Sequence, residues 1–270
     1  MRIEACLDGV REGTLIPYLG AGVSALVPGV PASPAALSAA IEAEVRVPRR
    51  AAGNMWAAAQ FVESRRFRAT LSTIVEKAFD VSATGNPVHD WIGRLRPPMV
   101  VDAWYDDGLI ETYRAGPGDW GWVQGVSRNG EWIEIWTRAY APDGTLQAAP
   151  DPGWGSLVYK PHGMARKGSS FLMSDSDYVE VLTEIDIQTP IPAEVKARRT
   201  GRGFLFLGCR FDDQMLRTFA RQIMKRSGGV HVAVIEGALT RMEARFLEEQ
   251  GIVRIDAPIA AVVEAIAAPA

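Results

Sequence analysis

The last third of the chain alternates short apolar runs with helical patterns, and this feature restricts the fold more than any other. Strands are predicted at residues 203–207, 230–235 and 252–255, and helices at 212–226, 240–250 and 258–268. Strands that read as continuous apolar runs and alternate with helices are typical of parallel sheets covered on both faces. The chain is therefore predicted to be an α/β protein with a Rossmann-like parallel sheet and helices on both faces.

The same sheet is expected to extend into the first part of the chain. Further buried strands are predicted at residues 14–19, 98–103 and 156–160, and helices at 3–12, after Asn86-Pro87, at 106–114 and within 176–199. Residues 34–79 predict two or three helices, so that a single domain over residues 1–270 carries a helical insertion at about 32–85. Gly20–Pro34 is expected to be a long loop.

Residues 120–140 change to an alternation of apolar and polar positions. Asn129-Gly130 stands between two alternating arms, and both residues tolerate positive φ. This predicts a β-hairpin insertion at about 118–141, within a wider stretch of 116–155. Its tryptophans either cover a ligand site or a partner surface, or pack one face on the core; they are Trp120, Trp122, Trp132 and Trp136.

Composition excludes several classes of function. The chain of 270 residues has a net charge of −3, which gives no basic surplus for direct nucleic-acid binding. No apolar run approaches the roughly 20 residues that cross a bilayer, and the mixed charges of the first dozen residues do not predict a signal peptide. Cys6 and Cys209 match no CxxC pair, so no metal site is expected. We expect a cytoplasmic protein, and a homo-oligomer or a protein partner stays open.

The predicted strands end in glycines and polar residues. In an open parallel sheet, ligands bind beyond the carboxyl ends of the strands. The five segments at those ends are Gly20-Ala21-Gly22-Val23-Ser24, Trp104-Tyr105-Asp106-Asp107, Lys160-Pro161-His162-Gly163, Gly208-Cys209-Arg210 and Glu236-Gly237. Their clustering predicts a nucleotide site at this edge of the sheet.

Each of these residues suggests a role. Gly20 and Gly22 would let backbone N–H groups approach a pyrophosphate. Ser24 would donate to a phosphate or ribose oxygen, and Glu236 would accept hydrogen bonds from a ribose diol. His162 would act near neutral pH as a general base on a water or a ribose hydroxyl.

The same residues also have simpler interpretations. A GxG sequence after a strand is common in any α/β protein and can be only a turn. His162 could cap a loop, and Asp106 and Asp107 could cap the helix that follows them. The other two histidines, His89 and His231, are interpreted as structural.

Six short motifs occur in one order along the chain: GAGVS, NPVHDWIGRL, YDDGLIE, YKPHG, SDSDY and FLGCRFDD. Together they resemble the sirtuin-related SIR2-like domains of bacteria, in the branch that lacks the zinc ribbon and occurs in NAD-cleaving defence proteins against phages. The resemblance covers about residues 10–265. It implies a Rossmann-like sheet with a helical insertion, and NAD or its product ADP-ribose as the ligand.

The resemblance also assigns site residues. It implies a phosphate-binding loop at Gly20, Ala21, Gly22, Val23 and Ser24, a second phosphate contact at Gly208 and Cys209, and a general base at His162, followed by Gly163. Tyr105 and Asp106 match the aromatic and acidic residues after the second strand of the relatives. Glu236 falls where zinc-bearing sirtuins place an Asn near the adenine ribose.

Trp104 departs from the family pattern. It stands where the relatives have an Asn that positions water and the nicotinamide ribose, and an indole has one donor and no acceptor. Either Asp102 or Asp106 takes over the polar role, or the site is degenerate.

Two functions therefore remain open. The favoured one is hydrolysis of NAD to nicotinamide and ADP-ribose, with His162 as base and with Ser24 and Asp106 positioning the ribose. The other is a catalytically weakened NAD- or ADP-ribose-binding sensor or scaffold. Protein deacylation is less favoured, because deacylating sirtuins use the zinc ribbon beside their acyl-lysine cleft.

Overall fold

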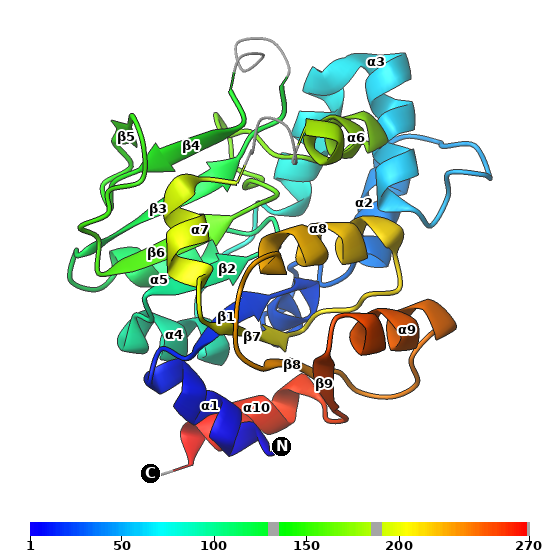
Figure 1. Ribbon diagram of the computed structural model, residues 1–270. Helices are drawn as coiled ribbons and strands as arrows, with labels where there is room; N and C mark the ends of the chain where they lie inside the picture. The colour runs from blue at the N-terminus through cyan, green and yellow to red at the C-terminus, as the bar shows by residue number, and fades with distance from the viewer. Residues whose placement is uncertain (129–134, 185–190, 269–270) are drawn as a thin grey trace.

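The computed structural model describes residues 1–128, 135–184 and 191–268, and their strands form one sheet (Figure 1). The sheet has nine strands in the order β5-β4-β3-β6-β2-β1-β7-β8-β9. The strands are β1 (Leu15–Leu19), β2 (Met99–Asp102), β3 (Trp120–Gly125), β4 (Thr137–Tyr140), β5 (Leu146–Gln147), β6 (Ser156–Lys160), β7 (Gly203–Leu207), β8 (His231–Val234) and β9 (Ile252–Ile255). The predicted α/β fold with a Rossmann-like sheet is confirmed.

Strands β3, β6, β2, β1, β7, β8 and β9 are paired in parallel, so their carboxyl ends share one edge. β1 lies in the middle, because it pairs with β2 on one side and with β7 on the other. After β1, the chain forms the strands on one side of it, of which the parallel ones are β2, β6 and β3 in order from β1 outward. It then returns to β7 and continues in the opposite direction through β8 and β9.

Helices cover both faces of the sheet. Those packed in one apolar layer are α2 (Pro34–Glu44), α3 (Met55–Ala78), α6 (Asp175–Glu184), α7 (Ala193–Arg199), α8 (Gln214–Met224) and α9 (Arg241–Glu249). Those packed in the other are α1 (Ile3–Arg11), α4 (Pro87–Leu95), α5 (Gly108–Arg114) and α10 (Ile259–Ala267). Successive strand residues alternate between the layers, since Phe204 and Phe206 belong to the first and Leu205 and Leu207 to the second.

The segment between β1 and β2 is mostly helical. The predicted loop over Gly20–Pro34 contains a short 3-10 helix, η1 (Ala21–Leu26). Ser33 and Asn54 begin α2 and α3, because each side chain accepts a hydrogen bond from a backbone N–H of the first helical turn. α3 is kinked at Phe67, where φ is 70° and ψ is 158°. Residues 34–79 therefore form three helical pieces, within the predicted two or three.

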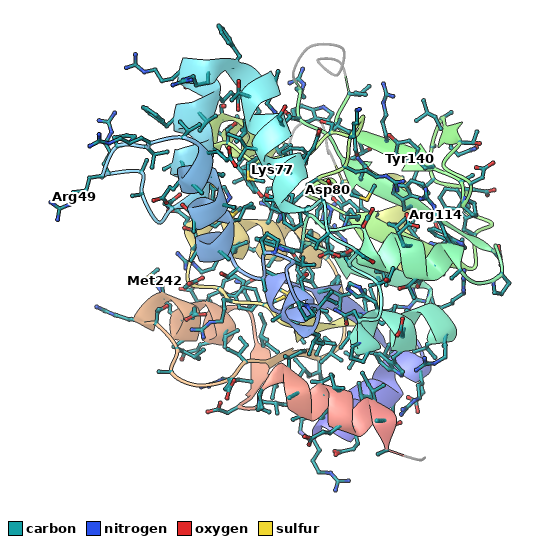
Figure 2. The ribbon with its side chains drawn as sticks, turned by 180° about the vertical axis from the view of Figure 1, so that it is seen from behind. Arg49, Lys77, Asp80, Arg114, Tyr140 and Met242 are labelled. Carbon is teal, nitrogen blue, oxygen red and sulfur yellow. The ribbon has the colours of Figure 1, made fainter. Side chains whose placement is uncertain are left out.

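One arm of the predicted hairpin, β3, is also a strand of the main sheet. β3 and β4 pair antiparallel, as expected, but β3 also pairs in parallel with β6. Trp120 and Trp122 are buried in the core, and Trp122 stacks on Tyr140 with ring centroids 4.9 Å apart. Arg114 covers Trp122, and Figure 2 shows Arg114 and Tyr140 near one another. Trp132 and the Asn129-Gly130 turn lie outside the described residues, as does the middle of the predicted helix over 176–199.

Candidate nucleotide site

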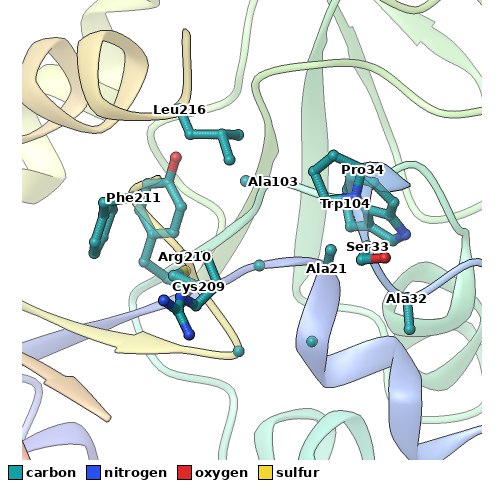
Figure 3. Close-up of a pocket in the computed structure, with 14 residues that line it drawn as sticks. Ala21, Ala32, Ser33, Pro34, Ala103, Trp104, Cys209, Arg210, Phe211 and Leu216 are labelled. Atoms are coloured by element: carbon teal, nitrogen blue, oxygen red, sulfur yellow. Dashed lines mark hydrogen bonds between the residues drawn. The ribbon is translucent and has the colours of Figure 1, made fainter. Parts of the chain in front are cut away.

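A small cavity opens at the carboxyl edge of the sheet, beside the central strand (Figure 3). Its volume is about 110 Å³. It is bounded by the segments that follow β1, β2 and β7 and by the start of α2. The lining residues are Tyr18, Gly20, Ala21, Gly22, Ala32, Ser33, Pro34, Ala103, Trp104, Gly208, Cys209, Arg210, Phe211 and Leu216.

The position of the cavity follows from the topology. The chain leaves β1 toward one side of the sheet and leaves β7 toward the other, so the loops after these neighbouring strands diverge. In open α/β sheets, the crevice at such a switch point is where ligands bind. The predicted GAG and GC segments therefore meet at one site, although they are 186 positions apart in the numbering, from Gly22 to Gly208.

The two glycine segments also pack directly on each other. Gly20 N–H donates to the Leu207 carbonyl (2.9 Å), and Gly22 N–H donates to the Gly208 carbonyl (2.8 Å). A Cβ on Gly22 would lie 2.9 Å from the Gly208 oxygen, and Gly208 itself has a φ of +62°. These glycines are thus required by the approach of two backbones. The N–H groups of Gly20 and Gly22, which we predicted to approach a pyrophosphate, are engaged within the protein in this structure.

The polar groups at the cavity are few and differ from those predicted. Ala21 begins η1, and its N–H has no hydrogen-bond partner among the described residues. Arg210 lines the cavity with a side chain that is 43% exposed, and it holds the buried carboxylate of Glu243 at 2.7 and 2.8 Å. Burial by itself raises the pKa of Glu243, but the hydrogen bonds from Arg210, Thr240 and Phe211 lower it to about 2. A fixed guanidinium and a helix-terminal N–H are groups that attract phosphate.

Trp104 forms one wall of the cavity. Figure 3 shows it with Ser33 and Pro34, across from Arg210 and Phe211. Its indole N–H donates to the Pro31 carbonyl at 2.6 Å, and Phe79 packs edge-on against the ring at 6.1 Å. Sites for drug-sized ligands measure roughly 300–1,000 Å³. At about 110 Å³, the cavity is smaller than such sites and has room for only part of a dinucleotide.

His162 does not line the cavity, but it is hydrogen-bonded to Ala103, which does. Its Nδ1 is 3.0 Å from the Ala103 carbonyl, which requires an Nδ1–H and leaves Nε2 as an acceptor. Nε2 is buried and has no partner among the described residues. The ring packs against Tyr178 and Phe219, and burial lowers the pKa of His162 to about 4.

Ser24 and Asp106 are brought together, as a shared site requires, but they face each other. The Ser24 hydroxyl donates to Asp106 at 2.6 Å, and both side chains are buried. Burial raises the pKa of Asp106, yet nearby His89 and Lys160 and the hydrogen bonds from Ser24 and Gly108 bring it below its usual value. Neither side chain lines the cavity.

A buried ion pair lies beside them. The Lys160 ammonium donates to Asp102 at 2.6 Å and to the Trp104 carbonyl at 2.8 Å. Burial raises the pKa of Asp102, against the opposing charge of Lys160. Asp102 therefore does not take over the role of the family Asn at the cavity; its contacts fix the backbone of Trp104 instead.

The remaining predicted residues have mainly structural surroundings. The Tyr105 hydroxyl is buried between Leu172 O and the Tyr178 hydroxyl, Val23 packs in the core, and Glu236 is exposed outside the cavity. The bond across Gly163 and Phe171 closes the turn after His162. Cys209 lines the cavity, and burial raises the pKa of its thiol well above the usual range.

Sequence reasoning missed the apolar part of the cavity. Tyr18, Phe211 and Leu216 come from β1, from the loop after β7 and from α8. Tyr18 is the last residue but one of its strand, and Phe211 follows GCR directly, so their nearness to strand ends was a usable signal. Leu216 gave none, because its position depends on how α8 packs.

Fold and cavity together define an α/β protein with a cavity at the switch point of a parallel sheet. A family model described as the SIR2-like domain matches residues 98–255, which is more than half of the chain. The chain therefore belongs to the SIR2-like family, whose domains generally bind NAD. No curated protein matches the sequence.

Two features are absent from the described residues. These residues contain no group of three or more His, Cys, Asp or Glu side chains that could hold a metal ion. None of their helices has the length and apolar character needed to cross a membrane.

Proposed function

We propose that the protein binds a NAD-derived nucleotide, NAD or ADP-ribose, at the cavity between β1 and β7, and acts as a sensor or scaffold with little or no turnover. The observation that carries this proposal is the cavity itself. It lies at the switch point of the sheet, and residues of both loops predicted to contact phosphate line it.

The lining suits such a ligand in two parts. Trp104, Phe211 and Leu216 offer apolar surface to one ring of the nucleotide. Phosphate oxygens at the mouth of the cavity would accept hydrogen bonds from the Ala21 N–H and from the guanidinium of Arg210. The ring and the phosphates thus have separate surroundings within one site.

The arrangement of the predicted catalytic groups favours binding over hydrolysis. Hydrolysis needs a base within hydrogen-bond reach of the water that it activates. His162 is held behind Ala103, and Ser24 and Asp106 use their oxygens on each other. Trp104 fills the position where the relatives have an Asn, and neither Asp102 nor Asp106 replaces that amide at the cavity wall.

NAD hydrolysis is the second candidate, and one observation favours it. His162 has the protonation state of a base: its Nδ1–H is oriented by Ala103, and its Nε2 is an unpartnered acceptor. Hydrolysis would then require a movement that brings this ring to the cavity. In that case a partner or an assembled state would switch on hydrolysis.

Binding and turnover are tested together. Calorimetry with ADP-ribose is expected to give a Kd in the micromolar range for the unaltered chain, on the order of −7 to −8 kcal/mol. Ala21→Leu fills the cavity and should weaken binding at least about tenfold, which is about 1.4 kcal/mol. The matched control is Ala36→Leu, which adds the same side chain at an exposed position of α2 outside the cavity. It should bind as the unaltered chain does.

Turnover is followed as nicotinamide released from NAD. The unaltered chain should release it no faster than a blank reaction. Trp104→Asn tests whether the indole at this position is what prevents nicotinamide release. Trp154→Asn is the control, because it makes the same substitution away from the cavity. Release by the unaltered chain that His162→Ala abolishes would replace our proposal by NAD hydrolysis. Absence of binding to both nucleotides would overturn both.

A further inference from the structure

The opposite edge of the sheet carries a concentration of positive charge. Residues 221–230, between the last turn of α8 and the start of β8, contain three Lys and Arg and no Asp or Glu, in a chain of net charge −3. These cations gather where α8 ends and β8 begins. In Figure 1 this end of α8 lies beside α7, and it is at the amino ends of the strands, away from the nucleotide cavity.

An open cavity of about 370 Å³ lies at this place. Arg221, Lys225 and Arg226 line it, together with Ser227 and His231. The His231 Nδ1 accepts the Phe204 N–H at 3.1 Å, so the neutral ring carries its proton on Nε2, near the Ser227 hydroxyl. The cavity thus combines cations with neutral polar side chains.

Cations are common at helix C-termini, where they interact with free carbonyls. Here the last carbonyls of α8 are already satisfied. Arg199 donates to Gln222 O (3.0 Å) and Ile223 O (2.7 Å), and the Ser227 hydroxyl donates to Met224 O (2.6 Å). Capping therefore does not account for Arg221 and Arg226.

Neither of these two arginines forms an ion pair with a described residue. The charge of Arg226 also acts on its cationic neighbours, since it contributes to lowering the pKa of Lys196 and of Arg199, after desolvation in both cases. Arg226 has a φ of 64°, a conformation that a glycine adopts more easily. Arg226 is thus kept where it repels other cations, and a bound anion would offset that repulsion.

We propose that this cavity is a second binding site, which takes the phosphate or pyrophosphate group of a small phosphorylated molecule. Two guanidinium groups match the several oxygens of such a group. The site is separate from the nucleotide cavity, and it does not depend on the function proposed above.

The test is calorimetric titration with pyrophosphate at low ionic strength, alone and with ADP-ribose at saturation. Arg226→Gly removes the cation while easing the backbone, and Arg221→Gln removes an exposed cation from a helix, so the double variant should fold. It is expected to weaken pyrophosphate binding about tenfold or more. The control is Arg245→Gln, which removes an exposed arginine of α9 and should change nothing.

Each other outcome overturns the assignment. Equal affinity of the double variant and the unaltered chain would show that the two arginines do not bind the anion. A pyrophosphate signal that disappears when ADP-ribose is added would belong to the nucleotide cavity. No signal for the unaltered chain at millimolar pyrophosphate would mean that the cavity binds no phosphate.

Discussion

At the scale of single residues, the surroundings of His162 determine its charge. Its ring is enclosed by Ala103, Tyr178 and Phe219, and no polar group in the described structure faces its Nε2. Such a histidine stays neutral, because protonation would place a charge in an apolar environment. The consequence is a measurable dependence of stability on pH.

The folded protein is expected to lose stability as the pH falls from about 6.5 toward 4 because of His162. Its pKa is about 4 in the folded state and about 6.5 when unfolded, so the unfolded chain binds the extra proton in this window. The loss should approach about 1.4 kcal/mol per pH unit inside the window and vanish above it. Urea unfolding of the unaltered chain and of His162→Gln at pH 7, 6 and 5 measures it. Parallel curves for the two proteins would contradict the buried, neutral histidine.

The position of His162 after β6 could be read from the sequence, but its surroundings could not. An apolar run followed by KPHG is local information, and parallel pairing brings that strand end to the shared edge. Tyr178 and Phe219 come from α6 and α8, so their packing on the ring depends on tertiary structure. For the same reason GAG was readable as a sharp turn, whereas the use of its N–H groups by the loop after β7 was not.

At the scale of elements, α3 contains an unfavourable backbone conformation at Phe67. Phe67 has φ 70° and ψ 158°, a region populated almost only by glycine, and its side chain is 81% exposed. Arg68, next in the chain, holds the kink by its hydrogen bonds to Asp177 and to the Phe171 carbonyl. The sequence SRRFRA continues a helical pattern, so nothing local indicates the break.

Phe67→Gly should therefore stabilise the fold. The substitution relieves strain of roughly 1–3 kcal/mol and removes little buried surface. Glycine also makes the unfolded chain more flexible, and this offsets part of the stabilisation. We expect a net increase of about 1 kcal/mol in the free energy of unfolding, measured by urea denaturation. Phe61→Gly, in an unkinked part of α3, is the control and should lower stability. A loss of stability in Phe67→Gly would show that the exposed ring or the kink is held by favourable contacts.

At the scale of the whole molecule, the site exists because distant parts of the chain meet at one edge. The family match begins at residue 98, yet β1 lies in the middle of the sheet and supplies one side of the cavity. Strand positions were predictable because buried parallel strands have a distinctive composition. The order of the strands, and with it the parallel pairing of β3 with β6, depends on contacts between segments that no local pattern specifies.

A crystal structure grown with ADP-ribose would show whether a NAD-derived nucleotide binds at the switch point. We predict the phosphates within hydrogen-bond distance of the Ala21 N–H and of Arg210, and the Trp104 ring moved from its place against Pro31. A structure with ADP-ribose bound elsewhere, or with an empty cavity at millimolar ligand, would contradict the account.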